Sequence, residues 1–211
     1  LEVDVNGGEP TASKNYKKIL ANLPENTIIV RMNTNGSRMI KELESILSKR
    51  VMVIVTLSFD GVGDTHDYVR WPIKWKNYAK NVKAYQDLQK QFPLLRLNSW
   101  TTVSCLNVAN LPNILDFTTE HSIDHDWAFL NTPHVFHVKH RNRFTEFAKN
   151  KLQSSSYAQC RQIADSVAIG KDNDKQLLDH INRQDTLRKI DYKDYFSFDP
   201  NFSRNNLANR S

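Results

Sequence analysis

Short apolar segments with the pattern of β-strands alternate with amphipathic helical segments along the first 130 residues. The clearest strand is 51–57, a nearly unbroken apolar run that is typical of a strand buried on both faces of a parallel sheet. Further strands are expected over 1–5, 27–32, 94–103 and 127–130. This alternation predicts right-handed βαβ units around a parallel sheet, and therefore an α/β fold.

The segments between these strands are expected to be helices, because apolar side chains recur there at spacings of three and four residues. The predicted helices cover 16–23, 39–47, 76–91 and 110–117. Residues 62–72 are expected to form a loop.

From about residue 141 onwards the pattern predicts helices only. Apolar stripes recur there, for example at Phe144, Ala148 and Leu152, and residues 191–211 form an aromatic tail that we expect to dock on the body. We therefore divide the chain into an α/β domain over 1–137 and a helical C-terminal extension with its tail over 138–211.

Composition describes an ordinary soluble protein, with 39% apolar and 25% charged residues. No apolar run approaches the length of a membrane span and no signal peptide is visible, so we expect a cytoplasmic protein without a membrane partner. The net charge of +6 is concentrated after residue 137, where 14 basic residues face 9 acidic ones. Such a basic tail fits either a solvated helical face or contact with nucleic acid.

The two cysteines, Cys105 and Cys160, lie far apart in the sequence and have no metal-site spacing. We expect both to be reduced, buried thiols. The histidines His134, His137 and His140 recur every three residues without an accompanying carboxylate or thiolate set, so we assign them no metal.

Polar residues follow three of the predicted strands, in the segments 7–9, 33–36 and 58–61. Because parallel strands end on the same edge of a sheet, we expect these groups to converge there. The first segment is the most distinctive, since Gly7 and Gly8 permit backbone conformations closed to other residues. Glu9 is held extended by the proline that follows it. We expect an exposed carboxylate and bare peptide groups at this strand end.

The tetrapeptide Gly7-Gly8-Glu9-Pro10 after a strand resembles the methionine-binding loop of the radical S-adenosylmethionine (SAM) enzymes. The later segments Asn33-Thr-Asn35-Gly and Ser58-Phe-Asp60-Gly, with His66-Asp67-x-x-Arg70 downstream, follow in the order found in that family. Over residues 1–150 the chain is similar to a radical SAM core from its second strand onward. The nearest likeness is to phage-type proteins with a twitch or related auxiliary-cluster domain. The resemblance implies a partial (β/α) barrel.

The resemblance also implies a role for individual residues. The loop Gly7-Gly8-Glu9-Pro10 would hold the methionyl ammonium of SAM, and Ser58 would contact its ribose or carboxylate. Arg70 would grip the carboxylate, because its planar fork can bind it at two points. Asn33 and Asn35 would line the pocket. Asp60 is the candidate catalytic residue that faces the substrate, whereas His66 and Asp67 are expected to order their loop.

The sequence departs from the family in one respect, because it has no Cys-x3-Cys-x2-Cys loop for a [4Fe–4S] cluster. Since the sequence begins within a strand and without methionine, we expect that an upstream segment of the parent protein carries this loop. The resemblance then implies a radical SAM enzyme that generates a 5′-deoxyadenosyl radical and modifies a substrate, with a peptide or protein as the implied class.

Two alternatives come from other classes of protein. One is a cluster-free α/β domain that binds SAM or a nucleotide without catalysis. The other is a nucleic-acid-associated protein that uses the basic tail.

Overall fold

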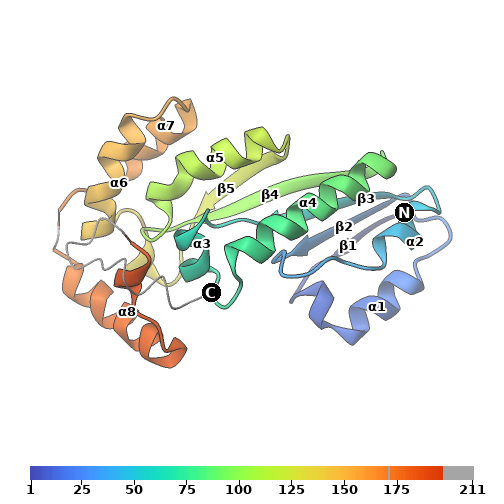
Figure 1. Ribbon diagram of the computed structural model, residues 1–211, viewed down its shortest axis with the longest axis horizontal. Coiled ribbons are helices and arrows are strands. Elements are labelled where there is room, and N and C mark those ends of the chain that lie inside the picture. The colour runs from blue at the N-terminus through green and yellow to red at the C-terminus, as the bar shows by residue number, and fades with distance from the viewer. Residues whose placement is uncertain (171, 197–211) are drawn as a thin grey trace. The chain divides into compact units, whose positions relative to one another are not determined.

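A five-stranded sheet forms the framework of the described part of the chain (Figure 1). This computed structural model describes residues 1–170 and 172–196, apart from the side chain of Lys14. The strands are arranged in the order β1-β2-β3-β4-β5, and β1 to β4 pair in parallel. Their bounds are β1 Glu2–Val5, β2 Ile29–Thr34, β3 Met52–Ser58, β4 Leu95–Val103 and β5 Asp124–Phe129. The predicted α/β fold of partial-barrel type, with a helical C-terminal extension, is confirmed.

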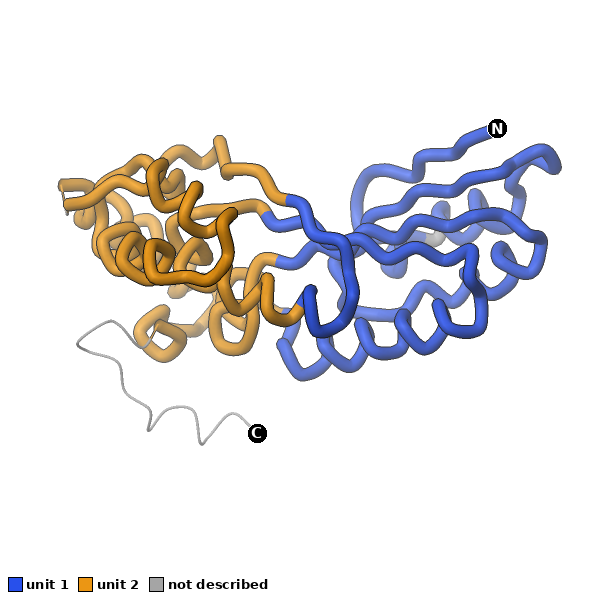
Figure 2. Tube along the Cα trace, turned by 90° about the horizontal axis from the view of Figure 1, so that it is seen from above, with its two compact units in different colours: residues 1–59, 73–101, 118–126 blue, residues 60–72, 102–117, 127–211 orange. Residues whose placement is uncertain are grey.

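The strand β3 shows why these residues form a sheet with one covered face. Val53, Val55 and Leu57 are buried, whereas the residues between them are only half-buried. The expectation that this strand is buried on both faces is therefore wrong. Helices of the same unit cover one face of the sheet (Figure 2), and the β3 side chains of the other face, Met52, Ile54, Thr56 and Ser58, stay partly exposed.

Helices connect the strands and continue beyond them. They are α1 Lys14–Ala21, α2 Leu43–Leu47, α3 Asp64–Val69, α4 Trp75–Gln91, α5 Leu111–Glu120, α6 Arg143–Gln153, α7 Ala158–Ser166 and α8 Asp174–Arg188. Short 3-10 turns lie at Pro10–Ala12, Val108–Asn110, His134–Phe136 and Tyr192–Asp194. None of the helices in the described part of the chain is long and apolar enough to cross a membrane.

Several sequence-predicted boundaries need correction. The helix expected over 39–47 is formed only by α2, because the segment before it is held in turns, with the Ile40 amide donating to the hydroxyl of Tyr85. The loop expected over 62–72 contains α3. The second and fifth strands are displaced from their expected positions. The sequence of β5, Asp-His-Asp-Trp-Ala-Phe, has no continuous apolar run, and its alternate side chains are exposed.

The chain forms two compact units, coloured separately in Figure 2. The first contains 1–59, 73–101 and 118–126, and its core joins strand residues such as Val30 and Val53 to helix residues such as Leu43 and Tyr85. The second contains 60–72, 102–117 and the described residues from 127 to 196. The boundary between residues 137 and 138 that we drew from the sequence stays a prediction.

An aromatic cluster forms the core of the second unit. Tyr195 and Phe196 are buried against Tyr68, and Phe196 also meets Phe144 edge to face. The expected docking of the aromatic tail is thus confirmed as far as Phe196. The rest of that tail lies outside the described residues.

Candidate ligand site at the strand ends

The loop after β1 presents open backbone. Gly7 and Gly8 have φ angles of +101° and +66°, which favour glycine, and both are exposed. A methyl group added at either position would meet no atom within 4 Å. The two glycines are therefore required by the backbone conformation, and the space beside their peptide groups is open to a ligand.

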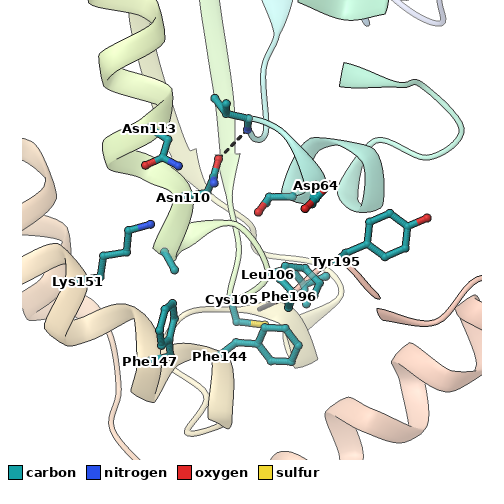
Figure 3. Close-up of a pocket in the computed structure, with 13 residues that line it drawn as sticks. Asp64, Cys105, Leu106, Asn110, Asn113, Phe144, Phe147, Lys151, Tyr195 and Phe196 are labelled. Atoms are coloured by element: carbon teal, nitrogen blue, oxygen red, sulfur yellow. Dashed lines mark hydrogen bonds between the residues drawn. The ribbon is translucent and has the colours of Figure 1, made fainter. Parts of the chain in front are cut away.

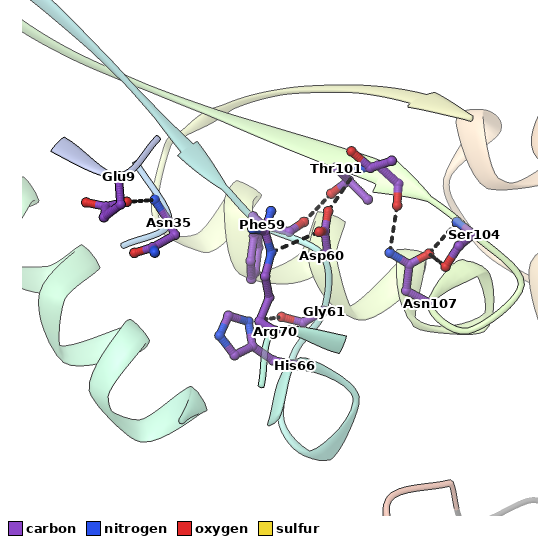
Figure 4. Close-up of polar contacts among 11 residues, drawn as sticks. Glu9, Asn35, Phe59, Asp60, Gly61, His66, Arg70, Thr101, Ser104 and Asn107 are labelled. Atoms are coloured by element: carbon purple, nitrogen blue, oxygen red, sulfur yellow. Dashed lines mark hydrogen bonds and ion pairs between the residues drawn. The ribbon is translucent and has the colours of Figure 1, made fainter. Parts of the chain in front are cut away.

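Glu9 anchors this loop. Its Oε1 atom accepts hydrogen bonds from the Thr11 amide (3.2 Å), the Thr11 hydroxyl (2.8 Å) and the Thr34 hydroxyl (2.9 Å), and its Oε2 atom accepts one from the Asn35 amide (2.7 Å). Figure 4 shows the bond to Asn35. The expectation of an exposed carboxylate is wrong, because Glu9 is half-buried and its oxygens accept hydrogen bonds from nearby donors.

The loop after β2 is shaped by its own turn. The Asn35 side chain accepts a hydrogen bond from the Ser37 amide at 2.9 Å, and Asn33 is exposed and donates to Asn6 at 3.3 Å. A Cβ atom at Gly36 would lie 2.5 Å from the ring of Tyr78, so only glycine fits there. That ring stacks with those of Phe59 and Trp75.

The structure thus brings most of the sequence-predicted SAM-binding residues to the ends of three neighbouring strands. Gly7, Gly8 and Pro10 follow β1, while Asn33 and Asn35 lie at the end of β2. Ser58 is the last residue of β3 and is half-buried. All of these residues belong to the first unit. Their contacts with a ligand stay predictions.

Asp60 and Arg70 lie in the second unit and are paired with each other. Arg70 Nε is 2.9 Å from Asp60 Oδ2, and the Thr102 amide donates to Asp60 Oδ1 at 2.8 Å (Figure 4). Burial raises the pKa of Asp60, and the charge of Arg70 opposes this shift. The guanidinium that was predicted to bind a SAM carboxylate thus already faces a carboxylate of its own unit.

Asp60 also lines a cavity of about 330 Å³, together with Thr102 and residues of α8. Arg188 on α8 is part of this lining. It donates to the Tyr68 carbonyl at 3.3 Å and lies over the rings of Tyr68 and Trp71. The sequence analysis missed Arg188, although it lies seven residues after Ile181 and so on the same helical face.

His66 orders the segment after β3, as predicted. It is fully buried, and its Nδ1 atom lies 3.2 Å from the Gly61 carbonyl oxygen, so Nδ1 carries the proton. Burial lowers the pKa of His66 to about 4 and keeps the ring neutral at pH 7. Neither the histidines at 134, 137 and 140 nor any other residues in the described part of the chain form a group that could hold a metal ion.

The cysteines do not fit an iron–sulfur cluster. Cys105 and Cys160 are the only cysteines in the sequence, and both are buried and free. Burial raises the pKa of each thiol, whereas a [4Fe–4S] cluster is held by several thiolates. The open glycine loop, in contrast, fits a ligand that approaches the backbone closely.

Comparisons with known proteins find the same fold. No protein-family model and no curated protein matches the chain. The crystal structure of Streptococcus suis SuiB bound to S-adenosylmethionine is similar, with a TM-score of 0.51, 18% identity, and 81% of this chain and 38% of SuiB covered. Two further SuiB structures, one of them bound to the precursor peptide SuiA, give TM-scores of 0.47 at 18% and 17% identity, covering 90% of this chain and 37% and 36% of SuiB. The chain therefore spans less than two fifths of SuiB and shares its α/β fold.

Proposed function

We propose that this chain binds SAM at the ends of β1, β2 and β3 and forms part of a radical SAM enzyme. The observation that carries the proposal is the open Gly7-Gly8 backbone at the carboxyl end of β1. Support comes from the order of the strand-end motifs and from the fold shared with SuiB, whose crystal structure contains SAM.

The methionyl ammonium of SAM would be bound by the carbonyl groups of Gly7 and Gly8. Glu9 would position the loop through its hydrogen bonds and would contribute negative charge beside the ammonium. Ser58 and Asn33 would contact the ribose or carboxylate. When bound, SAM supplies such enzymes with the 5′-deoxyadenosyl group that abstracts a hydrogen atom from the substrate.

The two buried cysteines favour placing any [4Fe–4S] cluster outside these 211 residues. They are also compatible with a second candidate function, that of a cluster-free SAM-binding domain. Both candidates require SAM binding by this chain, and a peptide or protein substrate stays a prediction of the family resemblance.

Replacement of Gly8 by alanine tests the proposal. SAM binding is measured by isothermal titration calorimetry on the wild-type chain and on Gly8→Ala, with free methionine as a competitor. We expect saturable binding to the wild type and an affinity loss of at least about tenfold in the variant, since the new side chain strains the backbone and fills the space beside the peptide groups.

Gly63→Ala is the matched control. Gly63 has a φ of +62°, and a methyl group there would also meet nothing within 4 Å, but it lies before α3 in the second unit. This variant should lose comparable stability and keep its SAM affinity. Absence of saturable SAM binding to the wild type, or equal affinity of wild type and Gly8→Ala, would contradict the proposed site.

A further inference from the structure

A second cavity lies wholly within the second unit and takes no part in the proposed SAM site (Figure 3). Its volume is about 290 Å³, close to the lower end of the range for small-molecule sites. Its lining comes from the start of α3, the segment leading into α5, one face of α6, and Tyr195 and Phe196.

One side of this cavity carries hydrogen-bond donors. The amine of Lys151, on α6, lies on the same side as the carboxamides of Asn110 and Asn113 in Figure 3. Lys151 is half-buried and forms no ion pair with any residue that the structure describes. The Asn110 oxygen is occupied by the Val62 amide at 2.7 Å, which leaves its nitrogen as a donor.

Aromatic side chains also contribute to the lining of the cavity. Phe147 lies one turn before Lys151 on the same face of α6, and this residue is 42% exposed. Phe144 and Cys105 also line the cavity and are buried. The thiol is too deeply buried, and its pKa too strongly raised, to act as a nucleophile.

The charged and polar groups around the cavity indicate which class of ligand it suits. A half-buried ammonium without an anionic partner and two carboxamides suit a carboxylate, whereas the aromatic rings suit an apolar body. Asp64 lines the cavity at a distance from Lys151 in Figure 3 and disfavours a second negative charge.

We infer that this cavity binds a small aromatic monocarboxylate. The carboxylate is held by Lys151, Asn110 and Asn113, and the ring lies against Phe147. The site is independent of SAM binding, so either proposal can fail without the other.

The test uses 3-phenylpropanoate and its uncharged amide as probes, with binding followed by ligand-observed NMR. The wild-type chain should bind the acid at least about tenfold more tightly than the amide, because charge-assisted hydrogen bonds are the stronger ones. Lys151→Met should lose this preference while it still binds the amide, and Lys151→Arg should retain it.

Lys149→Met is the control on the same helix, since Lys149 donates to the Val167 carbonyl and does not line the cavity. It should keep the preference for the acid. Equal binding of acid and amide to the wild type, no binding of either probe, or an unchanged preference in Lys151→Met would overturn the inference. If Lys151→Met does not fold, the comparison of the two probes on the wild type and on Lys151→Arg still decides.

Discussion

Glu9 in the first unit and Asp60 in the second are both carboxylates placed just beyond a strand end, yet their surroundings differ. Glu9 accepts hydrogen bonds only from amides and hydroxyls, and no ion pair of Glu9 occurs among the described side chains. Asp60 is buried against the guanidinium of Arg70. No described cation therefore compensates the charge of Glu9, whereas the charge of Asp60 is compensated within the protein.

The largest effect should follow from separating Asp60 and Arg70. Arg70→Met leaves a buried carboxylate without its counter-charge, so we expect a loss of about 3–5 kcal/mol in the free energy of unfolding, measured with urea. Asp60→Asn combined with Arg70→Met should cost less than Arg70→Met alone. Arg96→Met, at an exposed position of β4, is the control and should change little. A cost for Arg70→Met no larger than the control's would show that the pair is not coupled.

Protonation of two histidines should give the next largest effect, because His66 is buried in the second unit and His125 is half-buried in the first. Burial lowers the pKa of His66 and of His125 to about 4, against 6.5 for the free side chain. The folded state therefore binds fewer protons than the unfolded state between these values. Stability should fall as the pH drops from 7 to 4, by up to about 3 kcal/mol for each histidine.

The variants His66→Gln and His125→Gln separate the two contributions. Each should remove its own share of the pH dependence in urea unfolding curves recorded between pH 4 and pH 7. A variant with the same pH dependence as the wild type would mean that its histidine is already protonated, or accessible to water, in the folded protein.

A smaller effect is expected at Glu9. Glu9→Ala removes the acceptor of four hydrogen bonds at a half-exposed position, so we expect a loss of about 2 kcal/mol in the free energy of unfolding. Glu9→Gln should cost less stability, because it keeps one carbonyl acceptor, but it should weaken SAM binding by removing the charge. The control is Glu25→Gln, at an exposed position. If Glu9→Gln binds SAM like the control, the charge of Glu9 plays no part in the site.

Most of the strands and helices can be predicted from the sequence. The strand segments either alternate apolar with polar residues or are continuously apolar, and the helical segments carry an apolar stripe. The prediction fails where contacts between residues far apart in the sequence determine the local structure. The turn before α2 depends on the hydroxyl of Tyr85, which lies more than forty residues later. In the same way, the spacing of the motifs indicates that Arg70 lies near the edge of the sheet where the strands end, but it does not reveal that Arg70 faces Asp60.

The two candidate sites differ in the same respect, because one depends on local sequence and the other on tertiary packing. Gly7 and Gly8 are recognised from a local motif, because the backbone conformation that they allow is itself local. Lys151 has no such signal. It lies on the same helical face as Phe144 and Phe147, and only the packing of α6 beside the segment 105–113 makes it part of a cavity.

The hydrogen bonds of Glu9 have a consequence for motion. Its donors come from the segment after β1 and from the end of β2, so one carboxylate closes both loops together. Neither loop can open without breaking bonds that also hold the other, so the two form one cooperative opening unit. A ligand that stabilises the glycine backbone would slow the opening of the Asn35 turn as well, although it touches only the first loop.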